Sequence, residues 1–380
     1  MPLIHYLTQI QFDFGASALL LDECKRVGIS RPLVVTDKGV INAGVAAQAL
    51  AAIKGKLAYA EFDETPGNPT EAAVLQALAT YRAHEADGLI AVGGGSSMDL
   101  AKGVAILAGH PEPLVQYATI EGGSPKISAN CAPLIAMPTT SGTGSEVARG
   151  AIIILSDGRK LGFHSWNLMP KVAICDPDLT LGLPPGLTAA TGMDAVAHCI
   201  ETFLSAAFNP PAEGIALDGL ERAMKWICVA VADGGNREAR RQMMSASMQG
   251  ALAFQKGLGA VHSLSHALGS YPGKTLHHGT LNAVVLPTVL RFNATAESVV
   301  AQDKYAKLRR AMGIGADAPV DRFIAGLNRD IGIAGGLGEM GLPKSFFDEA
   351  IAKALKDHCH ATNPRIATAE EYRVMLEEAY

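Results

Sequence analysis

Short apolar runs recur through the first half of the chain and limit the folds that it can form. Four of them have the length and composition of buried strands: residues 33–37, 89–92, 132–137 and 172–175. Stretches with helical spacing separate them, as at 70–84 and 99–108. Because parallel strands need crossover helices that cover the sheet, this alternation predicts an α/β domain with a mainly parallel sheet. The run 151–155, followed by Asp157 and Gly158, predicts an added hairpin.

The pattern changes after Pro184, Pro185 and Gly186. From there helical spacing dominates and few alternating β-branched runs remain. The clearest helical segments are 189–205, 212–232, 239–254 and, behind a Thr368–Glu371 capping box, 369–378. We therefore expect an α/β domain over residues 1–185 and an all-α domain over residues 186–380.

Length and composition exclude several classes of protein. A chain of 380 residues is long enough for two domains, and its net charge of −5 gives no indication of a nucleic-acid partner. The six cysteines are scattered without a Cys-x-x-Cys pair, which is typical of free thiols in a reducing compartment. No apolar run approaches the ~20 residues needed to cross a bilayer, and a basic leader is absent. We expect a cytoplasmic protein with no membrane partner.

Two pairs of polar residues with helical spacing lie in the second half. Asp194 and His198 are four residues apart, as are His262 and His266, so each pair shares one helix face. Each pair alone is explained by hydrogen bonding within a core. Both segments, however, are dominated by apolar residues, where buried imidazoles and a carboxylate need compensation. A divalent transition metal of the iron, zinc or nickel type supplies it, and we favour that interpretation.

A glycine-rich loop at residues 93–97 follows one predicted strand and opens a predicted helix. Its bare backbone amides and the helix N-terminus suit a phosphate, although it is neither a Walker loop nor a Gly-x-Gly-x-x-Gly fingerprint. A second polar loop, 138–146, also follows a strand. Asp37 closes an earlier strand, where its carboxylate would accept from a ribose 2′-hydroxyl and favour NAD over NADP. From local sequence alone, a helix-capping role for Asp37 is an equal alternative.

Together these motifs resemble the iron-dependent (group III) alcohol dehydrogenases. The resemblance covers nearly the whole chain and rests on five stretches: Gly93–Ser96 with Asp99 and Lys102, residues 138–146, residues 176–180, Asp194 with His198, and His262 and His266 with His278-Gly279. It implies a dinucleotide-binding domain, a helical metal-binding domain and a site in the cleft between them. The implied activity is that of an NAD-linked alcohol dehydrogenase or aldehyde reductase with a small alcohol or aldehyde as substrate.

The resemblance also implies the residues of the site. Fe²⁺, or Zn²⁺, would be held by Asp194, His198, His262 and His278. His277 remains possible, because the interval from His266 is two residues longer than is usual in the family. His266 itself is implied near the nicotinamide, as a proton relay or as an orienting residue. The implied cofactor contacts are Asp37, Asn68, Gly94, Gly95, Ser96, Thr139, Thr140, Thr143, Lys160 and Leu179.

Within the family, the sequence is most similar to members that oxidise 4-hydroxybutyrate to succinic semialdehyde. We therefore expect this short ω-hydroxy acid as the substrate. Lys256 and Arg149 are the cations expected to pair with its carboxylate, unless both are ordinary surface or salt-bridged residues. Other substrates of the lactaldehyde or propanediol type are the alternative. Two alternatives to a dehydrogenase remain: a lyase similar to dehydroquinate synthase, and a cofactor-binding sensor without turnover. We also expect a homo-oligomer, such as a dimer.

Overall fold

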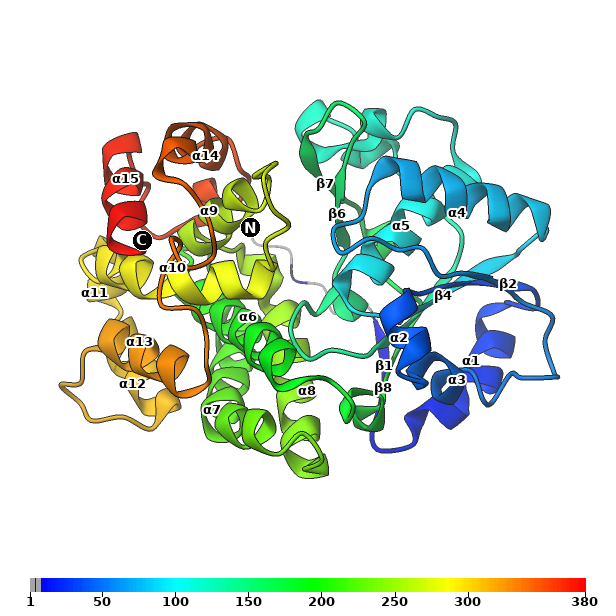
Figure 1. Cartoon of the computed structure of the whole chain (residues 1–380), viewed down its shortest axis with the longest axis horizontal. Helices are drawn as coiled ribbons and strands as arrows, with labels where there is room; N and C mark the ends of the chain where they lie inside the picture. The colour runs from blue at the N-terminus through cyan, green and yellow to red at the C-terminus, as the bar shows by residue number, and fades with distance from the viewer. Residues whose placement is uncertain (1–3, 5–7) are drawn as a thin grey trace. The chain divides into compact units, whose positions relative to one another are not determined.

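The computed structural model describes residue 4 and residues 8–380, and the chain forms two compact units (Figure 1). One contains residues 8–140 and 144–182 and is built around a sheet. The other contains residues 141–143 and 183–380 and is helical. The second unit thus begins close to the expected boundary, and it includes three residues from the polar loop of the first half.

The sheet has six parallel strands, as the alternating pattern predicted. Their order across the sheet is β1 (Gln9–Phe12), β8 (Val172–Cys175), β5 (Leu134–Pro138), β4 (Gly88–Gly93), β2 (Pro32–Val35) and β3 (Ala60–Phe62). The four central strands are the four that the apolar runs predicted. The edge strands β1 and β3 are only partly buried, so they lack the continuous apolar run of the others.

Successive residues of the strands face opposite sides of the sheet, and a separate apolar core covers each side. Leu33 and Val35 pack with helices α4 and α5, whereas Val34 packs with α1 and α3. The helices of this unit are α1 (Leu20–Val27), α2 (Lys38–Asn42), α3 (Val45–Ala49), α4 (Glu71–Ala83) and α5 (Gly95–Gly109). The predicted hairpin is confirmed as the antiparallel pair β6 (Gly150–Ile154) and β7 (Lys160–His164).

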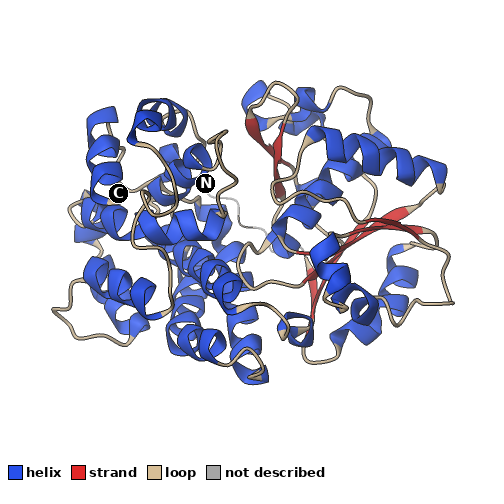
Figure 2. Ribbon diagram, in the orientation of Figure 1, coloured by secondary structure: helices blue, strands red, loops and turns tan. Residues whose placement is uncertain are grey.

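The second unit, which Figure 2 shows as helices joined by loops, is built around one buried helix, α6 (Pro185–Leu204). This helix packs against α7, α8 and α10. Every side chain of α6 from Thr188 to Leu204 is buried. The other helices are α7 (Pro210–Ala232), α8 (Arg237–Leu252), α9 (Ala260–Leu268), α10 (His278–Asn293), α11 (Glu297–Ala301), α12 (Lys304–Met312), α13 (Val320–Asp330), α14 (Phe347–Ala354) and α15 (Ala369–Glu378). The predicted capping box opens α15. The expected fold class, α/β followed by all-α, is confirmed.

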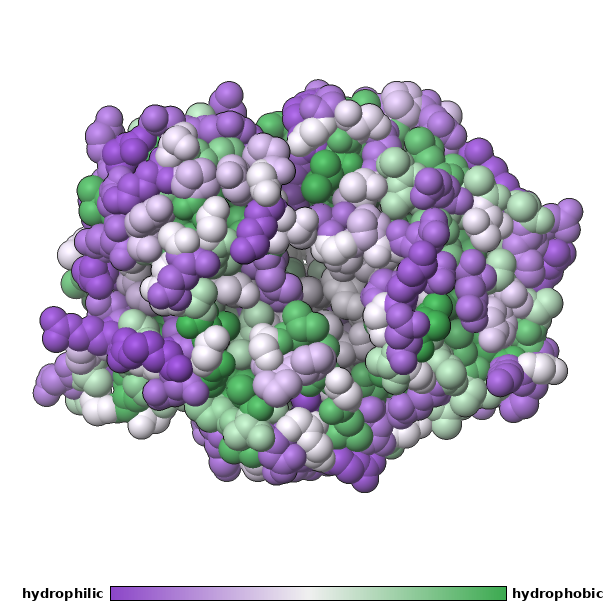
Figure 3. All heavy atoms as spheres, in the orientation of Figure 1, coloured by the Kyte–Doolittle hydropathy of each residue, from purple (hydrophilic) through white to green (hydrophobic). Residues whose placement is uncertain are grey.

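The surface of each unit carries polar and apolar side chains in mixture. Figure 3 shows hydrophilic and hydrophobic residues interspersed over the visible face of both units. Among residues 4 and 8–380, the structure contains no helix with the length and apolar character that a bilayer-spanning segment requires.

Candidate metal centre and nucleotide-binding loops

Helix α6 carries the first pair of expected metal ligands in the interior of the helical unit. Asp194 and His198 are 2% and 3% exposed, and His198 Nε2 lies 3.5 Å from Asp194 Oδ1. The small residues around them let neighbouring helices approach closely. Side chains of this polarity at such depth need compensation from partners or from a bound ion.

Helices α9 and α10 bring two further imidazoles to the same carboxylate oxygen. Asp194 Oδ1 lies 3.6 Å from His262 Nε2 and 3.7 Å from His278 Nε2. Ligand atoms bound to one tetrahedral ion at about 2.1 Å lie about 3.4 Å apart, so these separations suit a shared metal. Donor atoms of Asp194, His262 and His278 all lie within 4.8 Å of one another, and His198 lies beside that group.

Gly279, directly after His278, explains how α10 comes so close. A Cβ atom on Gly279 would lie 2.2 Å from the backbone oxygen of Ala190 on α6, which no side chain could tolerate. The close packing places the first residue of α10 beside Asp194. His277 is the exposed residue before the helix and lies outside the ligand group, so the structure favours His278 as the ligand.

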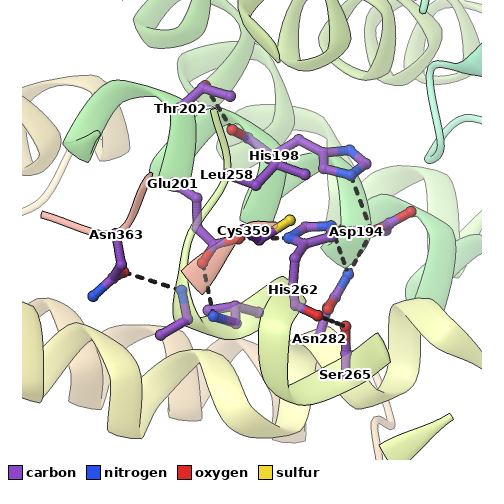
Figure 4. Close-up of polar contacts among 12 residues, drawn as sticks. Asp194, His198, Glu201, Thr202, Leu258, His262, Ser265, Asn282, Cys359 and Asn363 are labelled. Carbon is purple, nitrogen blue, oxygen red and sulfur yellow. Dashed lines mark hydrogen bonds and ion pairs between the residues drawn. The ribbon is translucent and has the colours of Figure 1, made fainter. Parts of the chain in front are cut away.

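Asn282, one turn into α10, also faces the ligand group (Figure 4). Its Nδ2 donates to Asp194 Oδ1 at 2.7 Å and lies 3.1 Å from the Nε2 atoms of both His262 and His278. Its buried Oδ1 has no hydrogen-bond partner among the described residues. The imidazoles and the carboxylate that surround this amide are a donor set that fits a divalent metal.

Two outer contacts orient the imidazoles. His198 Nδ1 lies 3.1 Å from the carbonyl oxygen of Gly142, and His262 Nδ1 lies 2.5 Å from Glu201 Oε2. With Nδ1 occupied in this way, each Nε2 is turned toward Asp194. The sequence interpretation missed Glu201, although it follows Asp194 and His198 at positions i+7 and i+3 of the same helix face.

The histidines around Asp194 stabilise the charged form of its carboxyl group. Burial alone would raise the pKa of the Asp194 carboxyl, but His198, His262 and His278 act against it and hold that pKa well below its usual range. The carboxylate is therefore ionised across the ordinary pH range, as a metal ligand must be.

His266 lies beside the ligand group. Its ring stacks on that of His278, with ring centroids 5.4 Å apart and an interplanar angle of 13°. Its Nδ1 lies 3.0 Å from Asp357 Oδ2, a partner that the sequence did not predict. This arrangement agrees with a position next to the metal, with Nδ1 held by a carboxylate.

The surroundings of Lys256 favour the alternative that it is a salt-bridged residue and not a substrate-binding cation. It is 1% exposed, and its Nζ lies 2.5 Å from Glu213 Oε1. Beside it, Lys304 Nζ donates to the carbonyl oxygens at the end of α6, those of residues 203, 204 and 205. The charge of Lys256 is thus neutralised inside the helical unit. Arg149, in contrast, is exposed and lies over the Trp166 ring at 4.7 Å.

In the sheet unit, the glycine-rich loop lies at the carboxyl ends of β4 and β5. Gly93 has φ +157°, and a Cβ there would lie 2.5 Å from Ser97 Oγ. Gly94 is the residue before helix α5, and a Cβ on it would lie 3.4 Å from Thr140 Oγ1. Thr139 donates its backbone N–H to the Gly93 carbonyl at 3.0 Å. The two polar loops predicted from the sequence are therefore neighbours.

Asp37 lies at the point where the strand order reverses, because β2 is followed by β3 on one side and β4 on the other. Open parallel sheets bind nucleotides at such a switch point. Asp37 Oδ1 accepts from the Val40 N–H at 3.0 Å and so caps α2, while Oδ2 would lie 3.6 Å from a Cβ on Gly93. The capping role and a position beside the glycine-rich loop therefore coexist.

The structure distributes the remaining expected cofactor residues unevenly. Lys160 Nζ lies 3.1 Å from Asn68 Oδ1. Ser96 Oγ, in the glycine-rich loop, donates to the carbonyl of Gly67, the residue before Asn68, at 2.8 Å. Asn68 and Lys160 therefore lie beside the glycine-rich loop. Leu179 is 1% exposed and packs in the apolar core of the sheet unit. Thr143 belongs to the segment that packs with the helical unit.

A buried lysine holds the second polar loop in place. Lys102 Nζ on α5 donates to Ser145 Oγ and to the carbonyls of Ser145, Ala148 and Gly150 at 2.7–2.9 Å. Burial lowers the pKa of Lys102 to about 8, against the opposing effect of Asp99 and Glu146. Burial likewise raises the pKa of Glu146 to about 7.

A switch-point sheet with a glycine-rich loop, joined to a helical unit with an aspartate–histidine cluster, defines a dinucleotide-binding enzyme with a metal centre. Family models agree: residues 8–177 match "Iron-containing alcohol dehydrogenase" and residues 188–380 match "Fe-containing alcohol dehydrogenase family, C-terminal". The chain belongs to the iron-containing alcohol dehydrogenase family. It is an NAD-linked, metal-dependent oxidoreductase that acts on CH–OH groups, which sets aside the lyase and sensor alternatives.

Individual relatives cover the whole chain. The 4-hydroxybutyrate dehydrogenase of Cupriavidus necator is 64% identical over 100% of both chains. The 1,3-propanediol dehydrogenase of Klebsiella pneumoniae is 34% identical, with 97% of this chain and 96% of that one covered. A crystal structure of 1,3-propanediol oxidoreductase superposes with a TM-score of 0.93 at 33% identity, over 100% of both chains.

Proposed function

We propose that this enzyme interconverts 4-hydroxybutyrate and succinic semialdehyde with NAD, using one divalent metal, Fe²⁺ before Zn²⁺. The observation that carries the substrate is the 64% identity, over full length, to a protein named 4-hydroxybutyrate dehydrogenase. The name of the family favours iron. Relatives at about half that identity bear other alcohol names, so 1,3-propanediol or lactaldehyde is the alternative substrate class.

The residues of the helical unit would bind the metal and accept the proton of the substrate alcohol. Asp194, His198, His262 and His278 are the proposed ligands, with Glu201 orienting one of the rings. When bound, the metal supplies Lewis-acid polarisation of the substrate oxygen while the nicotinamide exchanges hydride with the substrate carbon. Because Asp357 engages His266 Nδ1, His266 Nε2 is the atom proposed to accept the alcohol proton.

The residues of the sheet unit would bind NAD. The glycine-rich loop and the N-terminus of α5 suit the pyrophosphate, and Asp37 suits the adenosine ribose. Thr139, Thr140, Asn68 and Lys160 are proposed to complete the contacts. A homo-oligomer and a cytoplasmic location stay predictions.

Arg149 remains the proposed partner of the substrate carboxylate. The residue is exposed and its guanidinium lies over the Trp166 ring, and no ion pair with a carboxylate is found for it among residues 4 and 8–380. A charged hydrogen bond of this kind contributes about 1.5–3 kcal/mol, or roughly ten- to hundredfold in kcat/KM. Trp166 would hold the guanidinium plane in a fixed orientation.

The test is an NAD-linked substrate screen on protein loaded anaerobically with Fe²⁺ or with Zn²⁺. We expect the highest kcat/KM with 4-hydroxybutyrate, ahead of 1,3-propanediol and 1,2-propanediol. Arg149→Met should lower kcat/KM for succinic semialdehyde and spare butanal. Arg159→Met, which removes an exposed arginine already paired with Glu121 and Asp157, is the matched control. Equal use of butanal and succinic semialdehyde by the wild type would refute the substrate assignment and leave the family intact.

A further inference from the structure

A second group of metal-binding side chains lies next to the proposed metal centre. It contains His266 on α9 together with Asp357 and Cys359, which follow α14. Donor atoms of these three residues, an imidazole nitrogen, a carboxylate oxygen and a sulfur, all lie within 4.8 Å of one another. None of the three belongs to the Asp194 ligand group.

The loop after α14 is folded so that its donors converge. Asp357 Oδ1 accepts the backbone N–H of Cys359 at 2.8 Å, which turns the carboxylate and the thiol toward the same side. His358 lies between them, with Nε2 3.4 Å from Cys359 Sγ and Nδ1 3.7 Å from Asp357 Oδ1. Figure 4 shows Cys359 near the Glu201–His262 pair.

The chemistry of these donors selects the kind of ion. One thiol, one carboxylate and one or two imidazoles form a donor set typical of Zn²⁺ and unlike that of Mg²⁺ or Ca²⁺. The His266 and Asp357 side chains are 14% and 16% exposed, so an ion from solvent can reach them. Zinc bonds of about 2.1 Å to nitrogen or oxygen and about 2.3 Å to sulfur need donors about 3.3–3.7 Å apart, a modest tightening of the present cluster.

We propose that His266, Asp357 and Cys359 form a second, inhibitory site for a thiophilic divalent cation of the Zn²⁺ class. On binding, the Cys359 thiol loses its proton to solvent and the Nδ1 proton of His266 moves, by exchange with solvent, to Nε2. Bonds from Nδ1 and from the Asp357 carboxylate to the ion then replace the His266–Asp357 hydrogen bond. No electrons are transferred. The bound ion occupies the imidazole beside the reacting centre, so turnover falls. That last consequence rests on the proposed function of His266, whereas binding itself does not.

Cobalt(II) distinguishes the two sites, because only the second contains sulfur. Wild-type protein should take up two Co²⁺ per chain, and the second should bring the near-ultraviolet charge-transfer absorbance of a thiolate–cobalt bond. Cys359→Ser should keep one equivalent and lose this absorbance. His262→Ala should lose the sulfur-free equivalent and keep the absorbance. Cys131→Ser, which changes a cysteine of the sheet unit, should behave as the wild type.

Three results would overturn the proposal: uptake of a single equivalent by the wild type, a second equivalent without thiolate absorbance, or absorbance that survives Cys359→Ser. Asp357→Asn, which preserves the size of the side chain, provides a second variant and should weaken the second site at least tenfold. Added Zn²⁺ should inhibit iron-loaded wild-type enzyme, and Cys359→Ser should need at least tenfold more. Two equivalents with thiolate absorbance but no inhibition would reject the inhibitory role, and through it the proposed function of His266, while leaving the second site established.

Discussion

The carboxylate of Glu201 joins a proposed metal ligand to the helix that carries it. Oε2 lies 2.5 Å from His262 Nδ1, and Oε1 accepts the backbone N–H of Val261 at 2.7 Å. Glu201 is 3% exposed, so water competes little for either oxygen. One side chain of α6 therefore fixes both the first turn of α9 and the direction of the His262 ring.

Glu201→Gln should weaken metal binding. The amide keeps the size of the side chain but removes the charge that makes His262 a stronger donor, and such changes typically cost 10–100-fold in metal affinity. Competition with a coloured chelator at fixed pH measures the dissociation constant. Glu238→Gln on the surface of α8 is the control. An unchanged dissociation constant in Glu201→Gln would show that the contact is only structural.

His266→Ala should retain the metal of the Asp194 group and lose turnover. His266 stacks on His278 but is not part of the group around Asp194. After loading with one equivalent of Fe²⁺, metal content is measured by elemental analysis and kcat by NADH formation. We expect a fall of about 10²–10⁴-fold in kcat, the usual contribution of a general acid or base. A loss of iron as complete as in His262→Ala would make His266 a ligand instead.

Asp37→Asn should narrow the preference for NAD over NADP. Asparagine caps a helix as well as aspartate does, so α2 keeps its cap while the carboxylate charge disappears. Without the repulsion of a 2′-phosphate, the ratio of kcat/KM values should move toward NADP on the order of tenfold. Steady-state kinetics with both cofactors gives the ratio. Better use of NADP than NAD by the wild type would contradict the assignment.

Glu146→Gln should change how stability depends on pH. The pKa of this carboxyl rises from 4.5 to about 7 on folding, so the folded state binds its proton more tightly than the unfolded state. The wild type should therefore lose stability between about pH 4.5 and pH 7, by up to about 1.4 kcal/mol per pH unit, and level off above. Melting temperatures from pH 5.5 to pH 8 measure this. If the stability of Glu146→Gln falls with pH as steeply as that of the wild type, the fall belongs to other groups.

Lys256→Met should lower stability and leave substrate preference unchanged. The substitution removes the partner of Glu213, and breaking a partly buried ion pair costs about 1–3 kcal/mol. At about 2–4 °C per kcal/mol, the melting temperature should fall by several degrees. Lys225→Met, at an exposed position of α7, is the matched control. A selective loss of activity toward succinic semialdehyde, with stability unchanged, would restore Lys256 as a substrate contact.

Much of the fold follows from local patterns. The central strands of the sheet are buried on both faces, so each is a continuous apolar run that the sequence displays directly. The edge strand β1 is not visible in this way, because Gln9 and Gln11 donate to Glu23 instead of packing in a core. Its pairing with β8, about 160 residues away, is a property of the folded chain.

The same division holds for the site. The spacing of Asp194 and His198, and of His262 and His266, is sufficient to predict shared helix faces, because helix geometry depends only on neighbouring residues. Sequence spacing could not reveal that Glu201 meets His262, that Asp357 meets His266, or that Glu213 neutralises Lys256. Those partners are 61, 91 and 43 residues apart in the chain. Only tertiary packing brings them within hydrogen-bond distance, and it decides which polar groups are oriented, neutralised or left to bind an ion.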